Sequence, residues 1–294
     1  MQLWRVHLRP DTKGLDPVEL CIRQEVVGIG WRVPKKPNDR DEYWQEGEQE
    51  YGGMGWSRAA NAIGWRMAVG DLVWVRDFYG VYYLGKISGE WEYRDASENL
   101  EADIINVRPC TLFRVGSIVA GKIVNCFIPS STVQQIHDKT AEAFSVAVFN
   151  KVSGDRLPFK KPDSIDIFSL LSDVDLEDVI ALYLQDTFKL LFVPSSRARH
   201  STTPAFEYQL LDLHANTTVS VQVKGGNSIL DPADYYHFPD PCFLFAAGGY
   251  VRASTKESVV CIEREAIETY LIRAQEFLPA SLSTWLEMRN ELNG

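Results

Sequence analysis

The sequence lacks any uninterrupted run of 18 or more apolar residues, although 45% of its 294 residues are hydrophobic. A helix that spans a bilayer needs about 20 such residues, so we expect no membrane span and no membrane partner. The first ten residues, MQLWRVHLRP, are charged and alternate like a strand, and they have no apolar core of the kind found in a signal peptide. These absences predict a cytoplasmic protein.

Closely spaced cysteines are also missing. The five cysteines are scattered and form no C-x-x-C pair, which is a spacing typical of zinc sites and redox motifs. We therefore expect reduced core residues of a cytosolic protein. The chain also has no P-loop, G-x-G-x-x-G, H-E-x-x-H or G-x-S-x-G motif, and its five histidines are dispersed. The cysteines are Cys21, Cys110, Cys126, Cys242 and Cys261.

An excess of positive charge is lacking as well. The formal net charge is −10, and residues 152–294 hold 12 basic and 20 acidic side chains, against 18 and 20 in residues 1–151. A uniformly basic surface for nucleic acid is therefore not expected. A local basic rim would still suffice to contact phosphate groups, because these contacts are made by individual Lys and Arg side chains.

The length and a change in composition predict two domains joined by a linker. We place the domains at residues 1–150 and 165–294, and the linker at 151–164 (KVSGDRLPFKKPDS), which holds a glycine, two prolines and few apolar residues. Lys160 and Lys161 of the linker are candidates for contact with phosphate groups. The alternative is that they are solvated linker charges.

Short strands separated by turns fill residues 69–93 and predict a small β-barrel or curled sheet in a β-rich first domain. We expect further strands within residues 20–33, which end in VVGIGWRV, and at 123–127. Residues 130–149 are expected to form a helix that Pro129 and Ser130 begin.

Tryptophan is concentrated in this first domain, where seven of the eight lie before residue 92. Aromatic rings can sandwich a flipped base, with about 1–3 kcal/mol of stacking for each base. The same rings can simply fill the core of a small barrel. Trp31 and Trp91, which lie next to glycines and charged residues, are the best pocket candidates.

The segments GIGW (28–31), GDLVW (70–74) and YLGKI (83–87), together with Trp91, resemble the PUA-like superfamily and in particular its EVE-type domains. The resemblance covers about residues 1–128. It implies a small β-barrel that holds a modified base in an aromatic pocket, with Trp31, Trp91 and Tyr83 as candidate pocket residues.

The second domain is organised around residues 206–226, FEYQLLDLHANTTVSVQVKGG, which alternate like two strands joined by a tight turn. Because a strand repeats every two residues, Gln222 and Lys224 are expected on one face, and Val221 and Val223 on the other. Burying these polar groups near Glu207 is costly unless they serve a common ligand. A Mg²⁺ or Mn²⁺ ion bound to Glu207 and the Val223 carbonyl, beside Lys224, fits this set.

Polar residues on both sides of a buried strand at 188–193 extend this hypothesis. Glu177 lies one turn into a predicted helix, where it either joins the site or only favours the helix dipole. Arg197, Arg199 and His200 belong to a polar loop just before the hairpin. They are candidates to hold a phosphate backbone, and the alternative is a solvated loop.

The order of these elements is an acidic helix, a strand, a hairpin with Glu207 on its first arm and Gln222-x-Lys224 on its second, then a helix over 231–238 and a strand over 242–247. Over roughly residues 163–251 this order resembles the PD-(D/E)XK restriction-endonuclease-like superfamily, and most closely its Mrr-like branch, in which Gln replaces the second acid. The first-arm acid of that family is usually Asp, whereas this chain has Glu207.

The resemblance implies an α/β/α sheet and Mg²⁺-dependent (or Mn²⁺-dependent) cleavage of DNA. Glu207, Gln222, Lys224 and Glu177 would be catalytic, and Glu207, Glu177 and the Val223 carbonyl would bind the metal. The pairing of the two domains resembles modification-dependent restriction enzymes of phage defence. It implies DNA with modified bases as the partner, and a homodimer is an expectation because such domains often cut both strands in pairs.

Two alternatives remain open from the sequence. The second domain can be a catalytically degenerate nuclease fold that binds nucleic acid or a protein partner without cutting. The activity can also be directed at RNA, because PUA-like domains often read RNA.

Overall fold

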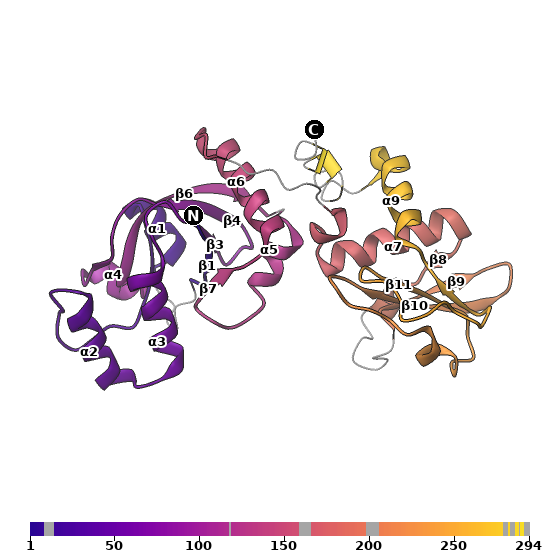
Figure 1. Ribbon diagram of the computed structural model, residues 1–294, viewed down its shortest axis with the longest axis horizontal. Helices are drawn as coiled ribbons and strands as arrows, with labels where there is room; N and C mark the ends of the chain where they lie inside the picture. The colour runs from indigo at the N-terminus through magenta and orange to yellow at the C-terminus, as the bar shows by residue number, and fades with distance from the viewer. Residues whose placement is uncertain are drawn as a thin grey trace. The chain divides into compact units, whose positions relative to one another are not determined.

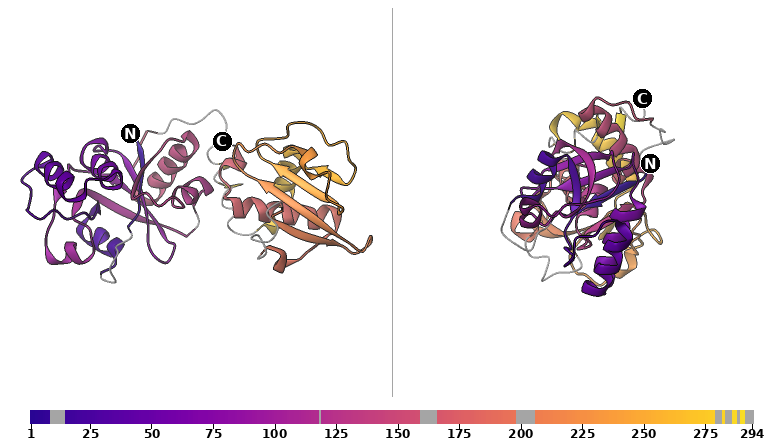
Figure 2. Two further views of the ribbon diagram at one scale, coloured as in Figure 1. Left: turned by 90° about the horizontal axis from the view of Figure 1, so that it is seen from below. Right: turned by 90° about the vertical axis from the view of Figure 1, so that its left-hand side faces the viewer.

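The computed structural model describes residues 1–8, 15–117, 119–158, 166–197, 206–278, 282, 286–287 and 289–290. The chain divides into two compact units, Met1–Pro162 and Asp163–Gly294. Each unit contains one mixed β-sheet with helices packed against it (Figures 1 and 2). None of the helices in the described residues is long and apolar enough to cross a membrane.

The first unit contains a curled sheet of seven strands in the order β2-β6-β4-β3-β1-β7, with β5 paired to β6. Strands β1 and β3 are parallel, and the other pairs are antiparallel. The sheet is an open half-barrel with β2 and β7 at the ends of this order, rather than a closed barrel. Its strands are β1 (Leu3–Val6), β2 (Val26–Ile29), β3 (Leu72–Arg76), β4 (Tyr82–Ile87), β5 (Glu92–Tyr93), β6 (Asn106–Gly116) and β7 (Val133–Ile136).

Helices cover this sheet. Helix α6 contacts it through a stack between Phe144 and Trp74 of β3, with ring centroids 6.1 Å apart. The indole of Trp74 also donates to the hydroxyl of Ser145 at 2.8 Å. The helices are α1 (Pro17–Gln24), α2 (Arg40–Tyr51), α3 (Met54–Asn61), α4 (Ser97–Glu101), α5 (Gly121–Cys126) and α6 (Lys139–Ser153), with a π-helical turn η1 (Ala62–Arg66) after α3.

One expectation for the first unit was wrong, and two were right only in part. The strand expected within residues 20–33 forms over Val26–Ile29 as β2. The residues before it belong to helix α1, since Asp16 accepts from the backbone of Val18 and Glu19 and so begins a helix. Residues 121–126 form helix α5 rather than a strand. The helix expected over 130–149 begins only at Lys139, capped by Asp138, because β7 pairs with β1 before it.

Helix α6 also shortens the expected linker. It extends to Ser153 and ends at Gly154, which has a φ of 76°. Residues 151–153 are therefore helical, while Lys160 and Lys161 lie outside the described residues.

The second unit contains a five-stranded sheet in the order β12-β11-β10-β9-β8. Strands β9 and β10 form the antiparallel hairpin expected from the sequence, while β10, β11 and β12 are parallel. The strands are β8 (Leu191–Phe192), β9 (Tyr208–Asp212), β10 (Thr217–Lys224), β11 (Cys242–Ala246) and β12 (Val259–Cys261).

The two faces of this sheet are covered differently. On one face, Phe188 at the end of helix α7 contacts Phe243, and Phe168 contacts Phe245, with centroids 4.9 and 5.4 Å apart. On the other face, among the described residues, a 3₁₀ turn η3 stands where the α-helix over 231–238 was expected. The helical elements of this unit are η2 (Ile167–Ser169), α7 (Asp173–Phe188), α8 (Pro194–Arg197), η3 (Pro232–Tyr235), α9 (Arg264–Arg273) and η4 (Gln275–Phe277).

Two buried thiols in the first unit predict a loss of stability in alkali. Burial raises the pKa of Cys21 to about 12 from 9.0, and it raises the pKa of Cys110 as well. As the pH rises above 9 the unfolded chain releases these protons first, so the free energy of unfolding should fall by about 1.4 kcal/mol per pH unit for each thiol. Urea midpoints from tryptophan fluorescence between pH 8 and pH 10 measure this slope. Cys110→Ala should reduce the slope, and an unchanged slope would contradict the assignment.

Candidate functional sites

The hairpin of the second unit brings Glu207, Gln222 and Lys224 together. The Lys224 ammonium donates to Glu207 Oε1 at 2.8 Å, and the Gln222 amide donates to the same oxygen at 3.1 Å. The Glu207 side chain is 13% exposed and that of Lys224 is 42% exposed. The three residues therefore form one partly enclosed polar cluster that solvent reaches from the side of Lys224.

The strand register explains why these side chains meet. Gln222 lies beside Leu244 and Lys224 beside Ala246 in the parallel β10–β11 pair, so both point to the face away from helix α7. The Glu207 N–H donates to the carbonyl of Val221, which already faces Tyr208 in the β9–β10 register. Glu207 and Tyr208 thus both lie opposite Val221. This is the arrangement of a β-bulge, which bends a strand and redirects a side chain.

One oxygen of this cluster is left over. Gln222 is only 2% exposed, and its Oε1 has no hydrogen-bond partner among the described residues. An unpaired buried amide oxygen costs about 1–3 kcal/mol, so such a group calls for a ligand. Carboxylate and amide oxygens are the donors that Mg²⁺ and Mn²⁺ prefer, and Glu207 with Gln222 Oε1 therefore fits a hard divalent cation.

The Val223 carbonyl has a direction that suits the same role. The carbonyl of the next residue, Lys224, accepts from Ala247 on the β11 side at 2.8 Å. Because backbone groups of successive strand residues point to opposite neighbours, the Val223 carbonyl points to the β9 side, where Glu207 precedes the strand. In the described part of the chain no three His, Cys, Asp or Glu side chains gather into a metal-binding group, so this donor set mixes one carboxylate with amide and backbone oxygens.

Glu177 and Arg197 are placed differently from the sequence expectation. Glu177 lies on α7, which covers the opposite face of the sheet from Gln222, and its carboxylate accepts from Arg197 at 2.9 Å. Arg197 also pairs with Asp178 at 2.8 Å. The charge of Arg197 is thus balanced inside the unit by two carboxylates, which leaves it poorly suited to hold a phosphate. Arg199 and His200 lie outside the described residues.

Two residues near the cluster were missed from the sequence. A Cβ added to Gly225 would lie 2.9 Å from Oδ1 of Asp173, so the carboxylate of this first residue of α7 lies against the end of β10. Tyr235 of η3 lies near Glu207: burial raises the pKa of its phenol, and the charges of neighbours that include Glu207 raise it further. Neither contact has a local sequence signal, because both depend on how separate elements pack.

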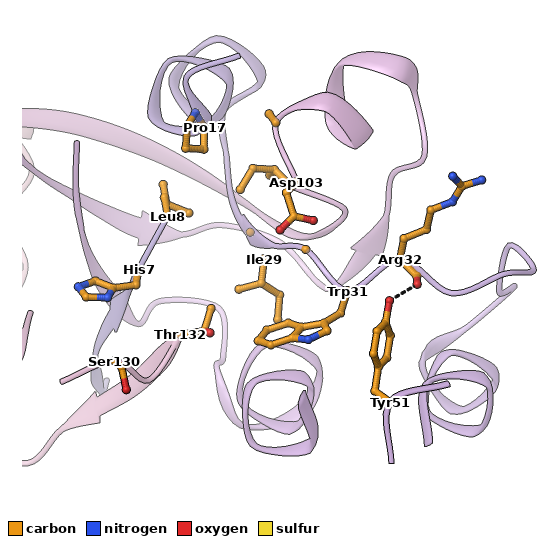
Figure 3. A pocket seen from close by; sticks show the side chains of 14 residues that line it. His7, Leu8, Pro17, Ile29, Trp31, Arg32, Tyr51, Asp103, Ser130 and Thr132 are labelled. Carbon is orange, nitrogen blue, oxygen red and sulfur yellow. Dashed lines mark hydrogen bonds between the residues drawn. The ribbon is translucent and has the colours of Figure 1, made fainter. Parts of the chain in front are cut away.

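A second candidate site is a cavity of about 560 Å³ in the first unit, within the size range of small-ligand pockets. Figure 3 shows Trp31 on one side of it and Asp103 on another, with Tyr51 donating its hydroxyl to the carbonyl of Arg32. The indole of Trp31 offers a stacking face, and Asp103 offers a hydrogen-bond acceptor. The cavity is lined by His7, Leu8, Pro17, Gly28, Ile29, Gly30, Trp31, Arg32, Tyr51, Ala102, Asp103, Ile104, Ser130 and Thr132.

The backbone around this cavity is unusual. Trp31 and Asp103 have φ values of 60° and 54°, in the left-handed region that residues other than glycine rarely adopt and that is enriched at functional sites. A Cβ on Gly30 would overlap the Asp103 carboxylate, so any larger residue there would have to displace that carboxylate. Asn106 fixes the loop by donating to the Gly30 carbonyl at 2.6 Å and to the Tyr43 hydroxyl at 3.0 Å.

Trp91 and Tyr83 do not line this cavity, in contrast to Trp31. Trp91 packs against Tyr43 with ring centroids 5.6 Å apart. The Tyr83 hydroxyl donates to Asp77 at 3.4 Å. Both residues, like Trp31, are half-buried and pack against the core of the unit.

Comparisons of the chain with protein-family models, with curated proteins and with solved structures find no match.

Proposed function

We propose that the second unit is a metal-dependent endonuclease that hydrolyses DNA phosphodiester bonds, on a restriction-endonuclease-like fold. The observation that carries this proposal is the cluster of Glu207, Gln222 and Lys224 with its unpaired, buried Gln222 Oε1. A site that binds a hard cation and a phosphate accounts for the acid, the amide and the ammonium together.

Each residue has a role in this account. Glu207, Gln222 Oε1 and the Val223 carbonyl would hold Mg²⁺ or Mn²⁺, which supplies Lewis-acid stabilisation of phosphate charge when bound. Lys224 reaches solvent and would orient the attacking water and neutralise charge on the phosphate. Glu177 has no role in our proposal, because Arg197 already holds its carboxylate and helix α7 covers the opposite face of the sheet.

The first unit would select the target on a PUA-like fold. Trp31 would stack on a flipped, modified base in the 560 Å³ cavity. The carboxylate of Asp103 accepts hydrogen bonds when ionised and cannot donate them. It can therefore accept from an N–H group on the edge of a flipped base. This selection would direct cleavage to modified DNA, as modification-dependent restriction enzymes do in phage defence.

The test is a cleavage assay of the full chain on matched DNA and RNA substrates, with Mg²⁺, with Mn²⁺ and with chelator. The proposal expects cleavage of DNA that needs the metal. Cleavage of RNA alone would favour the RNA-directed alternative. Tight binding without cleavage of either nucleic acid would favour a degenerate nuclease fold that acts as a binding module.

Binding of Mn²⁺ gives a readout that does not depend on activity. Titration calorimetry should show a site that is lost in Glu207→Gln and weakened in Gln222→Ala. An equal affinity of all three proteins would contradict the metal assignment.

A further inference from the structure

The turn between β3 and β4 presents two aromatic side chains to solvent. Phe78 is 65% exposed and Tyr79 is 88% exposed, and they are adjacent in the turn Asp77–Gly80. Single exposed apolar residues are ordinary, but paired aromatic rings at the tip of a hairpin are typical of a contact surface.

The turn holds these rings in a defined place. Asp77 Oδ1 accepts from the backbone N–H of Tyr79 at 2.9 Å and of Val81 at 2.8 Å, and the Asp77 N–H donates to the Val81 carbonyl at 3.0 Å. The conformation is thus set by the backbone and Asp77, and it does not require packing of Phe78 or Tyr79. The two rings are therefore free to serve a partner at little cost to the fold.

The turn lies beside the cavity that contains Trp31. A second cavity of about 430 Å³ is lined by Arg76, by residues 77–80 of the turn, and by His7 and Leu8. His7 and Leu8 also line the Trp31 cavity, so the two cavities are neighbours. Arg32 lines the first cavity and Arg76 the second, which places one cation at each.

We propose that Phe78 and Tyr79 insert into duplex DNA and fill the space left by a base taken into the Trp31 cavity. This inference rests on the proposed function of the first unit. Removing a base from a duplex costs a few kcal/mol of pairing and stacking, and apolar side chains inserted between base steps offset this cost. Arg32 and Arg76 are suited to contact the phosphates on either side of the extruded nucleotide.

The proposed insertion applies to a duplex rather than to a single strand. The Trp31 cavity accounts for one base, while the exposed rings lie outside that cavity. In a single strand the target base has no pairing partner and leaves no gap to fill. The turn should therefore matter only when the target base starts out paired.

The test compares the full chain with the double variant Phe78→Ala, Tyr79→Ala in fluorescence-anisotropy binding to three DNAs. These DNAs are a duplex with a paired 5-hydroxymethylcytosine, the same duplex with an abasic site opposite that base, and the single strand. The control variant is Phe277→Ala, which removes an equally exposed aromatic residue (85%) from the second unit.

The double variant should lose about tenfold or more in affinity for the paired duplex, and less than about twofold for the other two DNAs. An unchanged affinity for the paired duplex, or an equal loss on all three DNAs, would overturn the insertion while leaving base recognition in place. If the unaltered protein binds none of the three DNAs or their cytosine and 5-methylcytosine counterparts, the proposed function of the first unit fails and the insertion fails with it.

Discussion

Replacing Glu207 by Gln is expected to abolish DNA cleavage, with a fall in rate of about 10³-fold or more. The substitution keeps the shape of the side chain and removes the charge that the Lys224 ammonium and the Gln222 amide both contact through one oxygen. It also removes the only carboxylate of this hydrogen-bonded trio. Single-turnover cleavage of a labelled duplex with saturating Mn²⁺ measures the loss.

Glu177→Gln is the matched control, because it makes the same chemical change on the opposite face of the sheet. Glu177 lies on helix α7 and pairs with Arg197 of α8, so this variant should keep cleavage within a few-fold. If Glu177→Gln is as inactive as Glu207→Gln while circular dichroism shows both folded, Glu177 belongs to the site and our exclusion of it is wrong.

Replacing Trp31 by Ala is expected to remove the preference for a modified base. The variant loses the stacking face of the cavity, worth about 1–3 kcal/mol, which corresponds to about 5–150-fold in affinity. Competition binding between modified and unmodified duplexes measures the preference. Cleavage chemistry should persist, because Trp31 and Glu207 belong to different units.

Trp65→Ala is the control for this prediction. Trp65 is also in the first unit and is 39% exposed, but it does not line the Trp31 cavity. Trp31→Phe is a second control, which separates loss of stacking from loss of the fold. It keeps an aromatic face and should retain most of the preference for the modified base. An equal preference in Trp31→Ala and the unaltered protein, or an equal loss in Trp65→Ala, would contradict the assignment of the pocket.

The hairpin of the second unit was predictable because it depends on local information. Period-two alternation placed Gln222 and Lys224 on one face and Val221 and Val223 on the other, and the β9–β10 and β10–β11 registers confirm this. The meeting of Glu207 with these two residues follows from pairing of adjacent strands.

The remaining features depend on packing that a local pattern does not encode. Strand β7 is only four residues long, and it forms because β1 offers an edge that lies more than 120 residues earlier in the chain. The approach of Asp173 to Gly225 joins a helix start to a strand end. Trp31 and Trp91 have similar neighbours in the sequence, but only the left-handed backbone at Trp31, supported by Asn106, turns that residue toward a cavity.

The most direct test of the central claim is cleavage of phage DNA that carries unmodified, methylated and hydroxymethylated or glucosylated cytosine, with Mn²⁺, by the full chain and by Lys224→Ala. Lys189→Ala serves as the control, since Lys189 is an exposed lysine of the same unit. We predict that the unaltered protein and Lys189→Ala cut modified DNA, and that Lys224→Ala cuts none. Cleavage that survives in Lys224→Ala would remove this lysine from the mechanism. A folded protein that cuts no DNA at all would contradict the nuclease assignment and leave the binding module as the better account.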